Sequence, residues 1–208
     1  MKPQEYWGDP KLAPKWIRNR MFYSKNEQRY PKQEELVQVM LPKEFEKIAD
    51  NINGILEVGA GDGRLIGALA KKYKKKKCCS VDVNSVLSKY VAKKHKINTY
   101  VGDVTERLPF EDNDFDFVYT FQVLQHVMPE DIDNALIELK RIAKKELWLI
   151  EGWGDLQKWG VLNGHKRHGA GGGTFYWNID ELVECKETKF LNKNVGQAIN
   201  NKLYKVKI

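Results

Sequence analysis

The sequence predicts an α/β protein in which a largely parallel β-sheet is covered by helices on both faces. Short apolar runs alternate with helical patterns along the chain, and this alternation is typical of strands joined by crossover helices. A glycine-rich stretch lies directly between the first strand and the helix that follows, where a doubly wound sheet meets its ligand. The chain has 208 residues, 42% of them apolar and 30% charged, which fits one globular domain.

Five apolar runs are expected to form the parallel strands: residues 55–58, 79–83, 98–101, 115–120 and 147–151. Helices are expected between them, at residues 63–74, at residues 85–94 with Ser85 as the cap, and after Pro129. The helix after Pro129 has the clearest pattern, because its apolar residues recur with the three-and-four spacing of a buried stripe.

Further elements are expected before and after these strands. Residues 34–50 have the pattern of a helix broken at Pro42, which would cover the first strand. Asn178 and Glu181 form a capping-box pattern and predict a short helix that ends near Cys185.

Two alternating segments, residues 187–191 and 202–208, predict an antiparallel hairpin at one edge of the sheet. We therefore expect one domain over residues 1–208 with four parts: a basic aromatic arm (1–32), a cofactor-binding core (33–151), a lid loop (152–177), and a C-terminal helix with the edge hairpin (178–208).

The composition excludes several classes of protein. No apolar stretch approaches the roughly 20 residues of a membrane span, and the first residues lack the apolar core of a signal peptide, so we expect a cytoplasmic protein. Cys78, Cys79 and Cys185 are an odd number without metal-ligand spacing. Reduced thiols and no metal site are expected.

The spacing of the glycines separates two classes of cofactor. Gly59, Gly61 and Gly63 remove side chains where a ligand approaches the backbone, and the helix that follows supplies free N–H groups. A dinucleotide site has the spacing G-x-G-x-x-G, or alanine in the last position, and this last small residue lets helix and strand pack closely. Counted from Gly59, the last position of that motif is residue 64. Arg64 occupies that position. A nicotinamide-dependent oxidoreductase is therefore the weaker alternative.

The run Glu57-Val58-Gly59-Ala60-Gly61-Asp62-Gly63 resembles the first motif of class I S-adenosylmethionine-dependent methyltransferases. Later stretches continue the resemblance in the family's order, at residues 80–84, 102–104 and 108–127, the last similar to small-molecule and quinone-pathway methylases. The resemblance covers residues 54–150. It implies a three-layer Rossmann-like methyltransferase fold, with a seven-stranded mixed sheet in the order 3-2-1-4-5-7-6.

The resemblance also implies S-adenosyl-L-methionine as the cofactor and S-adenosyl-L-homocysteine as its product. The methionine end would lie against Glu57 and the first two glycines, and the ribose on Asp82. The adenine would lie on Asp103 and Val104, with Phe121 and Gln122 lining the mouth. The implied cofactor-binding residues are Glu57, Gly59, Ala60, Gly61, Gly63, Asp82, Val83, Asp103, Val104, Phe121 and Gln122. His126 is expected to pack beside the cofactor pocket.

The acceptor site is harder to identify, because the methyl donor is already activated and the protein mainly aligns two reactants and excludes water. A hydroxyl acceptor needs a general base, whereas an amine or a carboxylate does not. Glu151 ends the fifth strand at the ligand-binding edge, and the long loop after it contributes His165 and His168. These three are the candidate catalytic residues. The loop is expected to act as a lid, with an ordinary surface loop as the alternative.

The net charge of +7 raises the question of a nucleic-acid partner. Residues 1–32 hold eight Lys or Arg against three acidic residues, interleaved with aromatic side chains. Such an arm suits an anionic small molecule, stacking on bases, or packing on the core, and these options stay open. The basic run at 71–77 closes a helix at the remote edge, where cations complement the helix dipole. We expect a small-molecule acceptor, with RNA or another nucleic acid as the alternative.

Overall fold

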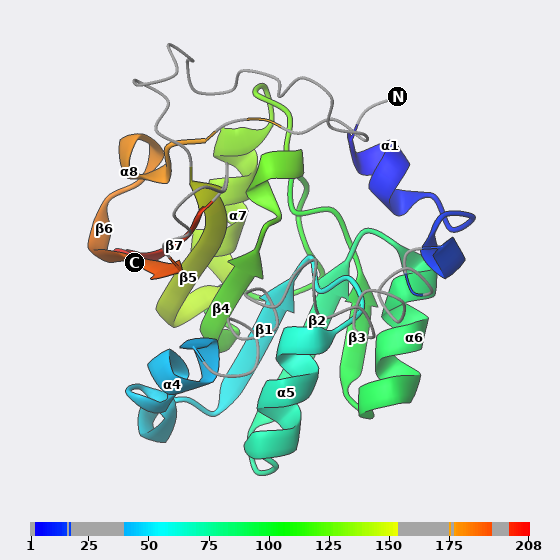
Figure 1. The fold of residues 1–208 in the computed structure, drawn as a ribbon, viewed down its shortest axis with the longest axis horizontal. Helices are drawn as coiled ribbons and strands as arrows, with labels where there is room; N and C mark the ends of the chain where they lie inside the picture. Colours follow the sequence, from blue (N-terminus) through cyan, green and yellow to red (C-terminus); the bar gives the residue numbers. More distant parts are fainter. Residues whose placement is uncertain (1–2, 16, 18–39, 154–174, 176, 193–199) are drawn as a thin grey trace.

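A computed structural model describes residues 3–15, 17, 40–153, 175, 177–192 and 200–208. This described part is a three-layer α/β fold built on a seven-stranded sheet (Figure 1). The strands stand in the order β3-β2-β1-β4-β5-β7-β6, so the predicted order is confirmed.

The strand bounds are β1 (Gly54–Val58), β2 (Lys77–Asp82), β3 (Asn98–Val101), β4 (Phe115–Phe121), β5 (Ala143–Trp153), β6 (Cys185–Asn192) and β7 (Asn200–Val206). The first five strands pair in parallel, and β7 runs antiparallel to both β5 and β6. The predicted edge hairpin is confirmed. β5 begins four residues earlier than expected, because Ala143 already pairs with Phe115 while the exposed Lys144 and Lys145 carry no apolar signal.

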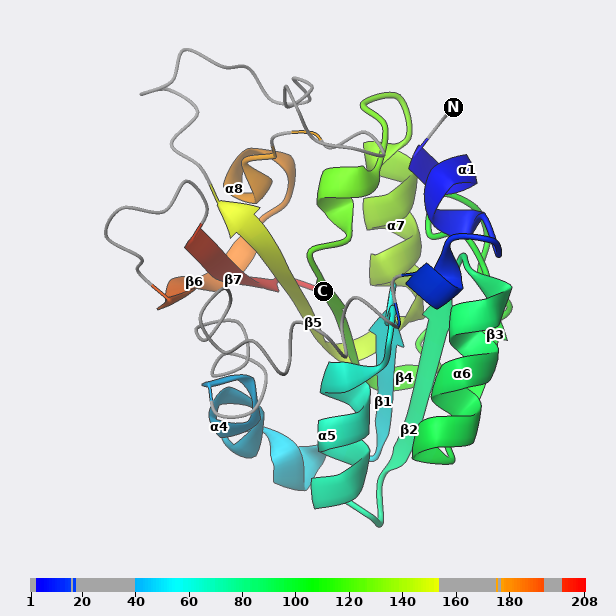
Figure 2. The same cartoon turned by 45° about the vertical axis from the view of Figure 1, so that its right-hand side comes forward.

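The helices form layers on both faces of the sheet (Figure 2). Their bounds are α1 (Pro3–Gly8), α4 (Leu41–Glu46), α5 (Arg64–Lys72), α6 (Ser85–His95), α7 (Ile132–Ile142) and α8 (Ile179–Leu182), with short 3-10 turns η2 (Ala49–Asn51) and η3 (Leu124–His126). One core cluster joins the sheet to α4 and α5, and the other joins it to α7 and α8. The sheet is therefore buried on both sides, as expected.

Several helix ends differ from the prediction. The cap of α6 is Asn84 and not Ser85, because Asn84 has extended backbone and its Oδ1 accepts from the amides of Val86 and Leu87 at 3.0 and 3.1 Å. Pro42 lies in the first turn of α4, where the missing N–H has no intrahelical partner to lose, and does not break that helix. Residues 34–39 lie outside the described residues.

The short helix near the C-terminus begins as expected. Asn178 is the N-cap residue of α8, although its Nδ2 donates to Glu181 Oε1 at 2.8 Å instead of the side chain accepting from the helix backbone. α8 ends at Leu182, after four residues. None of the helices in the described ranges is long and apolar enough to cross a membrane.

Candidate active site

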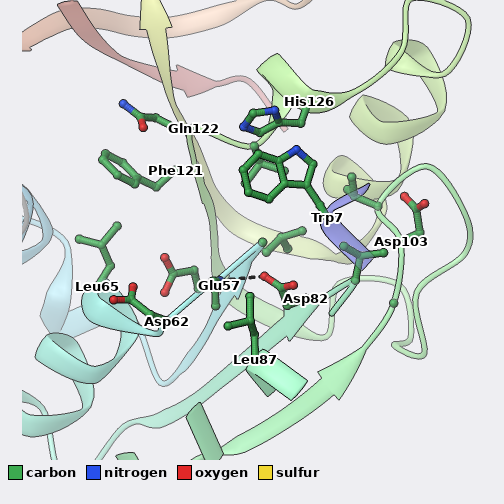
Figure 3. Close-up of a pocket in the computed structure, with 18 of the residues that line it drawn as sticks. Trp7, Glu57, Asp62, Leu65, Asp82, Leu87, Asp103, Phe121, Gln122 and His126 are labelled. Atoms are coloured by element: carbon green, nitrogen blue, oxygen red, sulfur yellow. Dashed lines mark hydrogen bonds between the residues drawn. The ribbon is translucent and has the colours of Figure 1, made fainter. Parts of the chain in front are cut away.

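A cavity of about 300 Å³ lies where the carboxyl ends of β1, β2 and β4 meet (Figure 3). Its walls come from the glycine loop after β1, the end of β2, the turn after β3, and residues 121–127 after β4. Trp7 and Ile17 of the N-terminal arm add to the lining. Ten of the eleven expected cofactor residues line this cavity, and Gly63 is the one that does not.

The glycine loop is shaped by contacts with the protein as well as by the cavity. Gly59 and Gly63 have φ of +72° and +73°, where side chains are disfavoured. A Cβ atom on Gly59 would lie 2.4 Å from Val123, and one on Gly63 would lie 2.8 Å from two methyl groups of Val91. A Cβ on Gly61, in contrast, would meet nothing within 4 Å. Gly59 and Gly63 therefore let the loop pack closely against neighbouring side chains, and Gly61 lies against open space.

Asp82 connects the glycine loop to the start of α6. Its Oδ2 accepts from the Gly61 amide and its Oδ1 from the Asn84 amide, both at 2.8 Å. Burial raises the pKa of this carboxyl, and the two backbone donors oppose the rise. Each oxygen has a further lone pair, so the carboxylate can still accept hydrogen bonds from a ligand in the cavity.

Glu57 is a buried acid at the end of β1, only 2% exposed. Its Oε2 accepts from the amide of Ile66 in the first turn of α5 at 2.9 Å. Burial raises the pKa of Glu57 to about 8, although the Ile66 amide acts in the opposite direction. The carboxyl lines the cavity (Figure 3) and is largely protonated at neutral pH until a cation is placed beside it.

Asp103 lines the cavity from the turn after β3. Its Oδ1 accepts from the amide and the hydroxyl of Thr105, at 2.9 and 2.8 Å. These bonds hold the turn in which Val104 is buried. The carboxylate therefore stands at the β3 side of the cavity, next to an apolar surface.

Trp7 and His126 contact each other in the cavity lining and were not among the expected cofactor residues. Their ring centroids are 4.5 Å apart at an interplanar angle of 54°. Asn84 is fully buried and its Nδ2 donates to the carbonyls of Trp7 and Asp9, at 2.9 and 3.0 Å. The aromatic content of the arm was a signal, but no spacing in the sequence indicates which of its tryptophans reaches the site.

Residues 56–150 match a family model described as a methyltransferase domain. This match identifies residues 56–150 as a class I S-adenosylmethionine-dependent methyltransferase domain. Two curated relatives agree: an uncharacterized methyltransferase of Schizosaccharomyces pombe, 34% identical over 110 residues, and the putative methyltransferase YrhH of Bacillus subtilis, 30% identical over 94 residues. The matches cover 47% and 43% of this chain, and only 38% and 51% of the relatives.

Two solved methyltransferase structures are similar in fold to this chain. The magnesium protoporphyrin IX methyltransferase of Synechocystis PCC 6803, solved with bound SAH, has a TM-score of 0.67 at 15% identity and full coverage of both chains. A TehB-like SAM-dependent methyltransferase of Corynebacterium glutamicum has a TM-score of 0.62 at 17% identity, covering 96% of this chain and 100% of its own. At these identities the likeness shows the fold.

The candidate catalytic residues of the methyltransferase are placed only in part. Glu151 is 2% exposed and is not among the described residues that line the cavity. Its Oε1 accepts from the Thr120 hydroxyl at 2.8 Å and the Val123 amide at 3.2 Å, while its Oε2 has no partner within the described residues. Burial raises the pKa of Glu151 to about 7. His165 and His168 lie outside the described residues.

The described part of the methyltransferase holds no group of three or more His, Cys, Asp or Glu side chains that could bind a metal ion. The three thiols are free, and those of Cys78 and Cys79 are buried in β2. Burial raises the pKa of both buried thiols, so they are not reactive thiolates at neutral pH.

Proposed function

We propose that this methyltransferase transfers the methyl group of S-adenosyl-L-methionine to a small-molecule acceptor and releases S-adenosyl-L-homocysteine. When bound, the cofactor supplies a methyl group on a positively charged sulfur. The observation that supports the proposal most directly is the single cavity wall that combines Glu57, the open backbone at Gly61, and Asp82. An acid at each end of the wall suits a ligand with an ammonium group at one end and a sugar diol further along.

The chain's own residues would share the work of binding. Glu57 and the glycine-loop backbone would hold the methionine end, and Asp82 would accept hydrogen bonds from the ribose hydroxyls. Asp103 would accept from the adenine amino group, with Val83 and Val104 against the ring. Ala60 belongs to the same wall, and Phe121 and Gln122 stand at the mouth. Gly63 would act indirectly, by letting α5 begin close to Val91.

A small acceptor is favoured by the part of the N-terminal arm that lines the cavity, Trp7 and Ile17, which we call the roof. Trp7 and Ile17 line the cavity together with the strand ends, so part of the opening is closed by the chain itself. A base in a folded nucleic acid would have to displace this roof to reach the reacting sulfur, whereas a small molecule only has to fit beside it. The basic arm keeps a nucleic acid as the second candidate.

Ligand binding and label transfer together test the function. We expect S-adenosylhomocysteine to raise the melting temperature, and NAD to leave it unchanged. With methyl-labelled cofactor, we expect label to enter a low-molecular-weight cell fraction in preference to purified total RNA. Stabilisation by NAD alone would contradict the choice of cofactor, and label found only in RNA would contradict the choice of acceptor.

We propose that Glu151 is a positioning residue and not the general base. It lies behind residues 121–127, and the bonds from Thr120 and Val123 fasten the turn that carries Gln122 and His126 into the cavity wall. Gln122 has a left-handed backbone with φ of +56°, so this turn depends on such support.

Hydrogen exchange tests this role of Glu151. In Glu151→Ala we expect amide exchange in residues 121–127 to rise about tenfold or more, because the Val123 amide loses its acceptor. Glu151→Gln should retain most of the protection, since an amide oxygen can still accept. Glu138→Ala is the matched control, because Glu138 is a buried carboxylate that instead accepts from the Leu108 amide at 2.7 Å. Unchanged exchange at 121–127 in Glu151→Ala would rule out the role.

A further inference from the structure

Trp7 lines the cavity beside His126, above Asp82 in the view of Figure 3. Its backbone carbonyl is held by Asn84, directly after β2, and its ring contacts His126, which follows β4. In the sheet β1 lies between β2 and β4. The indole is therefore held between the β2 side and the β4 side of a cavity that Glu57 and Asp82 also line.

This position of the Trp7 indole matters for the reaction if the proposed function is correct, and the inference rests on that function. A cofactor with its methionine end at Glu57 and its ribose at Asp82 would lie next to the indole in this cavity. The atom that joins these two parts of the molecule is the sulfur. The indole would then stand beside the one atom whose charge changes during the reaction, from a cationic sulfonium in the donor to a neutral thioether in the product.

We propose that Trp7 is a specificity-determining residue that favours the cationic donor over the neutral product. The face of an indole ring attracts a cation through its quadrupole, and among the aromatic side chains tryptophan does so most strongly. The attraction is lost when the sulfur becomes neutral. The Trp7 indole would thus bind S-adenosylhomocysteine less tightly than S-adenosylmethionine. This difference favours replacement of the product by a new molecule of the donor.

The nearby acids do not make this proposal redundant. Glu57 and Asp82 also favour a positive sulfur by simple attraction, but they are present whichever side chain stands at position 7. A comparison between variants at position 7 therefore isolates the contribution of the ring. Leucine and phenylalanine are the informative replacements, because both are smaller than tryptophan and only phenylalanine has an aromatic face.

The experiment is calorimetric titration of the full chain with three ligands at pH 7.5. These are S-adenosylmethionine, S-adenosylhomocysteine, and sinefungin, an unreactive analogue with a charged amine in place of the methylsulfonium. We expect Trp7→Leu to lose about three- to tenfold more affinity for the two cationic ligands than for S-adenosylhomocysteine. Trp7→Phe should keep most of the preference for the cations.

Tyr6→Leu is the matched control. Tyr6 is the neighbouring aromatic residue of the arm and contacts Trp7 edge-on, with ring centroids 5.2 Å apart, but it is not among the lining residues. It should leave the ratio of the three affinities unchanged. Circular dichroism and the melting temperature check that each variant is folded.

The outcomes separate this inference from the function on which it rests. Equal losses for all three ligands in Trp7→Leu, or no loss at all, would overturn the role of the ring while leaving the cofactor site intact. An equal loss of preference in Trp7→Phe and Trp7→Leu would also overturn it, since the aromatic face would then not be the cause. A wild-type chain that binds none of the three ligands would overturn the proposed function as well.

Discussion

Replacing Asp82 with alanine is expected to weaken S-adenosylhomocysteine binding at least tenfold, measured by calorimetric titration. Asp82 would lose its charge-assisted bonds to the ribose hydroxyls, which are worth roughly 1.5–3 kcal/mol each. The same carboxylate also accepts from the amides of Gly61 and Asn84. Its loss therefore removes a ligand contact and loosens the wall beside that contact.

Asparagine at position 82 should not restore binding. Both carboxylate oxygens accept from a backbone amide, so in either orientation an asparagine side chain would turn its NH₂ group toward one of those donors. Asp82→Asn is thus expected to bind nearly as weakly as Asp82→Ala. This result would distinguish a carboxylate that organises the loop from one that only contacts the ligand.

Asp116 provides the control for a general loss of stability. It lies at the opposite end of the sheet, where its Oδ2 accepts from the amides of Asn53 and Gly54 at 2.8 and 3.4 Å. Asp116→Ala should lower the melting temperature without changing the affinity for S-adenosylhomocysteine. The assignment of Asp82 to the cofactor fails if Asp82→Ala binds S-adenosylhomocysteine as the wild type does.

The strands and their order were predictable because they depend on features that are local in sequence. Buried strands such as β1 and β4 are almost continuous apolar runs, and the alternation with helices selects a parallel sheet. The predictions were wrong mainly at the ends of helices and strands, where polar residues determine the boundary. At the start of α6, Asn84 rather than Ser85 is the cap, and two neighbouring residues of capping type cannot be ranked without the backbone angles.

The cavity wall was predictable for the same reason, since its parts follow successive strands and parallel strands place their carboxyl ends at one edge. Trp7 was not, because its position depends on hydrogen bonds from Asn84, 77 residues away in the chain. The role of Gly63 was also hidden, as its neighbour Val91 lies on another helix. Long-range contacts of this kind leave no spacing in the sequence.

Glu57 is expected to make the ligand-free protein less stable as the pH rises from about 4.5 to about 8. Its pKa is about 8 in the folded protein and near 4.5 as a free side chain. Between these values the folded state holds a proton that the unfolded chain has lost, so the free energy of unfolding falls by up to ~1.4 kcal/mol per pH unit. The contribution is fully present below pH 4.5. Glu151, with a pKa of about 7, adds in the same direction.

Thermal melts between pH 5 and 8.5 test this dependence. Glu57→Gln should remove the slope between about pH 7 and 8 and leave below pH 7 the part that belongs to Glu151, whereas Glu151→Gln should reduce the slope only below about pH 7. Glu138 should not contribute to the slope in this pH range, because its pKa is lowered and it titrates at more acidic pH. Wild-type stability that is constant or rises across the range would show that Glu57 is ionised in the free protein.

The same proton is expected to link Glu57 to cofactor binding. If the carboxyl pairs with the ammonium group of the methionine end, it must ionise on binding, so a proton leaves the protein when S-adenosylhomocysteine enters. Affinity is then expected to rise as the pH increases from 6 to 8, by up to tenfold per unit.

Titrations in two buffers with different ionisation enthalpies count the released proton directly. Glu57→Gln should abolish both the release and the pH dependence, while Glu151→Gln retains them. Proton release that persists in Glu57→Gln would place the titrating group elsewhere in the cavity.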